Sequence, residues 1–144
     1  MVKERAYEFL EHTADAYIAA YGRNLADAFA TAARAMFDVM TQVEKVRPET
    51  ENLVEVDGND EYSLLYRWLE ALLVKSETKG MLYSKFEVTI TEKMSVLKLE
   101  ARIWGEKFNV EKHLQKVGVK AVTYHRMEII KSSKKVTLRF ILDI

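Results

Sequence analysis

The sequence of 144 residues contains no cysteine, which excludes disulfide bonds, thiolate metal sites and a cysteine nucleophile. It has a single proline, Pro48, and few asparagines or glutamines; together with 31% charged residues this composition favours a heat-adapted source. No run approaches the roughly 20 apolar residues of a membrane span, and the opening residues MVKERAYEF lack the apolar segment of a signal peptide. We therefore expect a soluble, cytoplasmic protein with no membrane association.

An excess of charge is missing as well, because 22 basic residues balance 22 acidic ones. Bulk electrostatic attraction to nucleic acid or to an anionic membrane is not expected, so any RNA contact should come through a partner. The chain contains neither GxGxxG nor GxxxxGK(S/T), and no GxSxG or HExxH. These absences exclude the standard nucleotide-binding loops, a serine-hydrolase elbow and a zincin-type site.

Hydrophobic residues make up 49% of the sequence, enough for one packed core, and we expect a single domain spanning residues 1–144. Apolar residues at three- and four-residue steps predict one helix from Asn24 to Val43 and another from Asp60 to Lys79-Gly80. Alternating segments predict strands over residues 7–11, 16–21, 53–56, 86–90, 97–103, 119–124, 127–130 and 136–143. Because helices and strands mix without regular βαβ alternation, the predicted class is α+β: a compact domain with a mainly antiparallel sheet and two amphipathic helices.

Three polar segments interrupt or end the predicted strands. They are His12-Thr13-Ala14-Asp15, Lys120 to His125, and Asp143 with the carboxylate of Ile144. If the first and last strands are neighbours in the sheet, Asp15 and Asp143 converge with the C-terminus. Three negative groups repel one another unless they are protonated or neutralised by a cation. An all-oxygen set of this kind suits a hard divalent ion such as Ca²⁺, Mg²⁺ or Mn²⁺.

Each of these residues also has an ordinary structural interpretation. An Asp between two strands is more often a turn residue that bonds its own backbone than a metal ligand, and Asp143 alone is typical of a solvated strand end. His12 fits a packing or turn histidine, and His125 fits the start of a hairpin turn. His113, in the polar segment 105–118, is predicted to be a surface residue. The residues alone therefore indicate a soluble α+β domain and leave the metal site open.

Nine short segments follow one another in a fixed order along the whole chain: Glu11-His12-Thr13-Ala14-Asp15, Tyr21-Gly22, Met36 to Met40, Leu64-Leu65, Trp68 to Leu73, Gly105-Glu106, His113, Lys120 to His125, and Asp143-Ile144. In these residues and their order the chain resembles the archease family. Ala16 departs from the Ile or Val usual in the family, and the loop before Lys120 varies. Neither departure involves a predicted ligand.

The resemblance implies a strand–helix–strand–strand type of fold and a protein cofactor rather than an enzyme. The partner would be the GTP-dependent RNA ligase of tRNA splicing. The chain would speed guanylylation of the ligase's active-site histidine, allow multiple turnover and broaden its NTP specificity. By the same resemblance, a divalent metal ion (Ca, Mn or Mg) would be held by Asp15, Asp143 and Ile144, the last through its backbone or terminal oxygens. The residues expected near the ion or at the ligase contact are His12, Lys120, Thr123 and His125.

Two other classes of function stay open. One is a metal-dependent phosphohydrolase that uses the same carboxylates with His12 as base, although the sequence shows no glycine loop or arginine clamp to match a phosphate substrate. The other is a chaperone-like partner of a different tRNA-processing enzyme, such as a tRNA methyltransferase.

Overall fold

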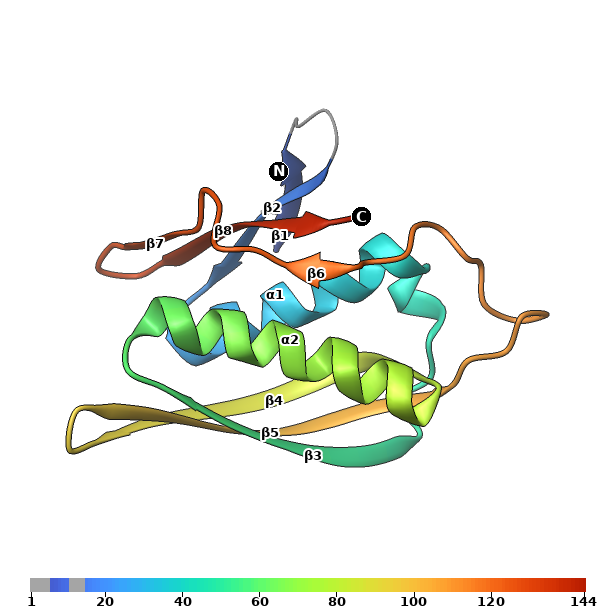
Figure 1. Ribbon diagram of the computed structural model, residues 1–144, viewed down its shortest axis with the longest axis horizontal. Helices are drawn as coiled ribbons and strands as arrows, with labels where there is room; N and C mark the ends of the chain where they lie inside the picture. Colours follow the sequence, from blue (N-terminus) through green and yellow to red (C-terminus); the bar gives the residue numbers. More distant parts are fainter. Residues whose placement is uncertain (1–5, 11–14) are drawn as a thin grey trace.

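The computed structural model describes residues 6–10 and 15–144 and arranges them in three layers (Figure 1). The elements in chain order are β1 (Tyr7–Leu10), β2 (Asp15–Gly22), α1 (Leu25–Met40), the 3-10 turn η1 (Val43–Lys45), β3 (Thr50–Gly58), α2 (Glu61–Lys79), β4 (Met81–Lys93), β5 (Val96–Lys107), β6 (Ala121–Val122), β7 (Glu128–Lys131) and β8 (Val136–Asp143). One outer layer is a five-stranded sheet in the order β1-β2-β8-β6, with β7 also paired to β8; the other is a three-stranded sheet in the order β3-β5-β4.

The two helices form the middle layer. Helix α1 packs against β2 of one sheet and β4 of the other, while α2 packs against β3 and β6 (Figure 1). The strand pairs of both sheets are antiparallel. The predicted α+β class with two helices is therefore confirmed, and the strands divide between two sheets that enclose the helices. Within the described residues, neither helix combines the length and apolar character needed to cross a bilayer.

Both helices begin at the predicted caps. The Asn24 side chain accepts a hydrogen bond from the backbone N–H of Asp27 at 2.8 Å, and the Asp60 side chain accepts one from the N–H of Ser63 at 2.8 Å. These bonds satisfy N–H groups that have no partner within the helix. Helix α2 closes at Gly80, whose φ of 62° lies in the left-handed region that glycine enters without steric cost.

Helix α1 ends at Met40, three residues before the predicted end at Val43. The backbone N–H of Val43 donates to the Asp38 carboxylate at 3.1 Å, and the Met40 carbonyl accepts from the N–H of Lys116 at 3.0 Å. The loop of residues 108–120 therefore takes the place of the next helical turn. Hydrophobic periodicity does not report such a contact, because it comes from a distant part of the chain.

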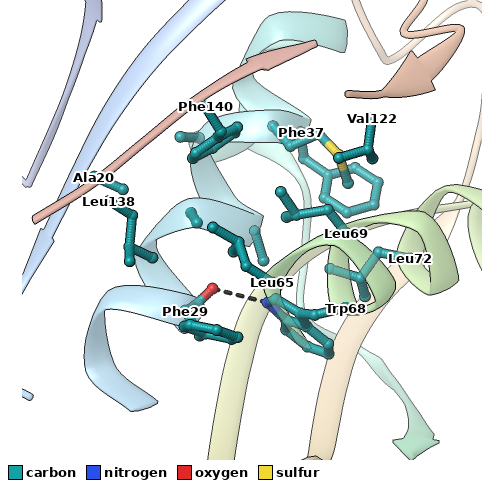
Figure 2. Close-up of a cluster of buried hydrophobic side chains, with 14 of the residues drawn as sticks. Ala20, Phe29, Phe37, Leu65, Trp68, Leu69, Leu72, Val122, Leu138 and Phe140 are labelled. Atoms are coloured by element: carbon teal, nitrogen blue, oxygen red, sulfur yellow. Dashed lines mark hydrogen bonds between the residues drawn. The ribbon is translucent and has the colours of Figure 1, made fainter. Parts of the chain in front are cut away.

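A fully buried aromatic and aliphatic cluster joins the layers (Figure 2). Phe29 and Phe37 come from α1, Leu65 and Trp68 from α2, and Phe140 from β8. The indole N–H of Trp68 donates to the Phe29 carbonyl at 2.9 Å, so the one polar atom of this side chain is satisfied. Each such side chain contributes about 1.5–3 kcal/mol by burial, which fixes the five-stranded sheet firmly to the helices beneath it.

One edge of β8 is shared by two short strands. Strand β7 pairs with the first half of β8, and β6 pairs with Leu142 and Asp143 at its end. The strand predicted over residues 119–124 is accordingly only two residues long. Thr123 follows the last residue of β6, and both its hydroxyl and its N–H donate to the Ile141 carbonyl, at 3.0 and 3.3 Å.

Candidate functional site

The predicted ligands Asp15 and Asp143 lie directly opposite each other at one end of the β2–β8 ladder. Residues in this relation on antiparallel strands project from the same face of the sheet, with Cβ atoms about 4.5–5.5 Å apart. Asp143 is exposed and Asp15 is half-buried. The strand pairing on which the predicted convergence depends is therefore present, at the end of β8 marked C in Figure 1.

The end of β8 is also held from its other side. Ala121 pairs with Asp143, and the backbone N–H of Lys120 donates to the Asp143 carbonyl at 2.7 Å. Thr123 donates a hydrogen bond to the carbonyl of Ile141, two residues before Asp143 on β8. Two of the predicted near-site residues, Lys120 and Thr123, thus lie beside the aspartate pair and fix the strand that carries Asp143. The Lys120 residue itself is exposed.

Of the two predicted histidines, the structure describes His125 and leaves His12 undescribed. His125 is exposed in the loop between β6 and β7, one residue before Arg126. His12 lies outside the described residues, together with Glu11, Thr13 and Ala14 of the first polar segment. Of that segment, only Asp15 is placed.

The donor chemistry of this corner fits a hard cation. Two carboxylates directly opposite on a strand pair destabilise the sheet unless a positive charge or a proton offsets them. The described residues contain no group of three or more His, Cys, Asp and Glu side chains that would bind a metal by themselves. A site here needs the main-chain oxygens of Ile144 or water in addition to Asp15 and Asp143, and such an all-oxygen set suits Ca²⁺, Mg²⁺ or Mn²⁺.

His113 is buried, with 4% of its surface exposed, so its prediction as a surface residue is wrong. Its Nδ1 accepts a hydrogen bond from the backbone N–H of Asn109 at 2.9 Å. That leaves Nε2 as the donor to the Glu106 carboxylate, also at 2.9 Å. The pair pins the loop of residues 108–120, which leads from β5 to Lys120 beside the aspartates.

Glu106 is strongly held in its ionised form. Burial opposes ionisation, but hydrogen bonds from the Arg47 backbone N–H, from Lys112 and from His113 outweigh it and lower the pKa of Glu106 to about 2. The preceding Gly105 is required by close packing, because a Cβ there would lie 1.8 Å from the Leu82 carbonyl oxygen. Gly105, Glu106 and His113 therefore hold the loop of residues 108–120 and do not contact the Asp15–Asp143 pair directly.

Arg126 is a neighbour of the aspartate pair that the sequence did not indicate. Its guanidinium lies 5.0 Å from the centre of the Tyr17 ring, and Tyr17 is two residues from Asp15 along β2. Arg126 has a φ of 57°, a left-handed conformation that an arginine does not signal. Only its place directly after His125 connected it to a predicted site residue.

Comparison with known proteins places this arrangement in a family. The model of the Archease protein family (MTH1598/TM1083) matches residues 7–144. The chain is 51% identical to Protein archease of Sulfurisphaera tokodaii over 138 residues, covering 96% of this chain and 98% of that protein. It is 45% identical to Protein archease of Sulfolobus acidocaldarius, with the same coverage.

A solved structure agrees with the fold. The solution structure of Methanobacterium thermoautotrophicum protein 1598 matches with a TM-score of 0.86 and 43% sequence identity, covering 96% of this chain and 99% of that chain. Sequence and structure point to the same relatives over nearly the whole length of the chain, and the chain belongs to the archease family.

Proposed function

We propose that this chain is a non-catalytic protein cofactor of the GTP-dependent tRNA-splicing RNA ligase. It speeds guanylylation of the ligase's active-site histidine, permits multiple turnover and broadens the choice of NTP. Its working part is a divalent-metal site formed by Asp15, Asp143 and the oxygens of Ile144. Its contact with RNA runs through the ligase.

Membership of the archease family supports a cofactor role in activation of a tRNA-splicing ligase. The structural observation that carries the finer proposal is the register that sets Asp15 directly opposite Asp143. The other predicted ligand, Ile144, is bonded to Asp143 and shares its place at the end of β8. Three oxygen-bearing positions thus gather at one corner of the sheet.

A divalent ion held by Asp15, Asp143 and the oxygens of Ile144 would supply positive charge to offset the negative charge that develops on the phosphates during guanylyl transfer. The chain's own residues position the oxygens. Strands β2 and β8 place the two carboxylates on one face of the sheet. The hydrogen bonds that Lys120 and Thr123 donate to carbonyls of β8 fix the position of its last residues. Because this role requires only that charge be presented to the partner, the chain needs no turnover of its own.

The test is the rate at which GTP guanylylates the ligase in the presence of Asp15→Asn and Asp143→Asn. Each change keeps the size of the side chain and removes its charge. We expect the stimulated rate to fall at least about tenfold, towards that of the ligase alone. Undiminished stimulation by both variants would refute the proposal.

Asp57→Asn is the matched control. Asp57 is an exposed aspartate on β3, and within residues 6–10 and 15–144 its one ion pair is a long contact with Arg67, 3.8 Å between Oδ1 and Nη1. Its loss should leave stimulation unchanged. Incubation of the chain alone with model phosphodiesters and Mn²⁺ completes the test, since turnover that depends on Asp15 and Asp143 would indicate a phosphohydrolase instead.

A further inference from the structure

The outer face of the five-stranded sheet carries more than the two aspartates. Side chains alternate between faces along a strand. The pairs Asp15–Asp143 and Ala19–Arg139 therefore share one face, while Ile18 and Phe140 point to the opposite face and lie in the core. Arg139 precedes Asp143 by four residues on β8, which is about 13 Å along the strand.

Arg126 reaches the same face from the loop between β6 and β7. Its guanidinium stacks over Tyr17, whose strand partner is Ile141, between Arg139 and Asp143 on β8. Arg126 is exposed, and no carboxylate among residues 6–10 and 15–144 forms an ion pair with it. A solvent-facing guanidinium thus lies over Tyr17, on the face of the sheet that carries Asp15, Asp143 and Arg139.

The backbone of Arg126 is in a costly conformation. A φ of 57° is unfavourable for most residues with a Cβ; glycine would relieve the strain and asparagine would lower it. The turn that contains it is closed by a bond from the Met127 N–H to the Tyr124 carbonyl at 3.1 Å. Such strain persists where the surroundings impose it, and it gathers at functional sites.

Arg139 supplies a second, independent observation. Its Nε is buried and has no hydrogen-bond partner, the one side-chain atom in this state among the described residues. Its Nη1 forms a long ion pair with its strand partner Glu128, 3.9 Å from Oε1 and beyond hydrogen-bond range. A buried N–H donor without a partner is costly, and an anion is the natural acceptor for it.

We infer that Arg126 and Arg139 form an anion subsite beside the Asp15–Asp143 corner and that its ligand is a phosphate group. Guanidinium groups bind phosphate oxygens through paired N–H donors. Under the proposed function, the divalent ion held by the neighbouring aspartates would offset their repulsion of a phosphate. The inference deepens the proposed function, since the phosphate belongs either to the nucleotide or to the RNA terminus that the ligase joins.

The test measures phosphate binding by the whole chain without the ligase. Wild-type protein with Mg²⁺ is titrated with inorganic pyrophosphate, with a short RNA bearing a 3′-phosphate and with the same RNA ending in a 3′-hydroxyl. Calorimetry gives the dissociation constants, and NMR follows the arginine Nε–H signals. We expect the Arg126 and Arg139 signals to shift with at least one of the two phosphate ligands.

Arg126→Met keeps an aliphatic cover over Tyr17 and removes the charge, so it separates packing from anion binding. We expect it to weaken phosphate binding about tenfold or more, and Arg126→Lys to recover part of the loss. Arg102→Met is the matched control, because Arg102 is an exposed arginine on the outer face of the other sheet. It should bind like wild type.

The outcomes separate the two possible sources of phosphate. If Arg126→Met weakens the binding of pyrophosphate alone, the subsite binds the nucleotide. If it weakens the binding of the 3′-phosphate RNA alone, the subsite binds the RNA end. Equal binding by Arg126→Met and wild type, or equal weakening for the 3′-hydroxyl RNA, overturns the inference. If Asp15→Asn abolishes ligase stimulation while Arg126→Met binds phosphate normally, only the subsite fails. If wild type does not stimulate the ligase but Arg126→Met weakens phosphate binding, only the proposed function fails.

Discussion

The two sheets treat like charges on their outer faces differently. On the three-stranded sheet, Glu55 and Glu100 are direct strand partners, and Lys98 lies against both, 3.2 Å from the first and 3.7 Å from the second. The hydrogen bond to Glu55, together with the negative charges of Glu55 and Glu100, raises the pKa of Lys98. On the five-stranded sheet, Asp15 and Asp143 are direct partners in the same way, but no lysine or arginine among the described residues forms an ion pair with Asp143.

On the three-stranded sheet a lysine side chain neutralises the paired carboxylates. A cross-strand pair of carboxylates is tolerated when a lysine sits between them, since it removes the repulsion. Under the proposed function, the positive charge at the Asp15–Asp143 pair comes from an ion in solution. We therefore regard the Asp15–Asp143 corner as the place where an external ion plays the part that Lys98 plays on the other sheet.

Removing divalent ions should have the largest effect. After chelation, stimulation of the ligase should fall at least about tenfold and return when Mg²⁺, Mn²⁺ or Ca²⁺ is added back. The same ions should raise the melting temperature of the wild-type chain, because a ligand at 100 times its Kd adds about 2.7 kcal/mol to the free energy of unfolding. Melting curves of Asp15→Asn should not respond. An equal response of both proteins would place the ion elsewhere.

The next effect concerns the connection between the two sheets, where Glu106 binds His113. A carboxylate whose folded pKa is about 2, against an ordinary 4.5, adds stability above pH 4.5 that is lost as the pH falls towards 2. We expect Glu106→Gln to lower the free energy of unfolding at pH 7 by about 1–2 kcal/mol and to flatten its decline between pH 4.5 and 2. Urea unfolding at several pH values measures both, with Glu100→Gln as the control. An unchanged acid profile would mean that Glu106 does not hold the loop.

A smaller effect is expected on the three-stranded sheet. Lys98→Met leaves Glu55 and Glu100 facing each other without their shared cation, so the free energy of unfolding should fall slightly. Ligase stimulation should stay at the wild-type level. A loss of stimulation would show that the outer face of this sheet contacts the ligase, and the contrast between the two faces would disappear.

Much of the fold follows from local patterns in the sequence. The caps at Asn24, Asp60 and Gly80 and the strand Val136–Asp143 are predictable because neighbouring residues determine them. The end of α1 at Met40 and the burial of His113 are not, since both depend on contacts made by distant segments. The division of the strands into two sheets is likewise a property of the whole chain.

The candidate site divides in the same way. The sequence identified Asp15 and Asp143 as strand-end carboxylates, but their meeting depended on which strands pair, and only the β2–β8 register establishes it. Arg126 escaped notice because arginine has no preference for a positive φ, and Arg139 because a charged residue in a half-exposed strand is ordinary. The metal ligands themselves stay a prediction that the experiments above test.

The smallest effect on stability, and the sharpest contrast with function, is expected for Arg126→Gly. The change relieves a positive φ that costs about 1–2 kcal/mol, while it forfeits about 0.5–1 kcal/mol of cation–π contact with Tyr17 and a similar amount through the freer unfolded chain. The free energy of unfolding should therefore stay within about 1 kcal/mol of wild type, although phosphate binding weakens as it does for Arg126→Met. Arg102→Gly, in the extended backbone of β5, has no strain to relieve and should lose about 1 kcal/mol in urea unfolding. If Arg126→Gly instead unfolds more easily than Arg102→Gly, the arginine is there to cover Tyr17, and its charge is incidental.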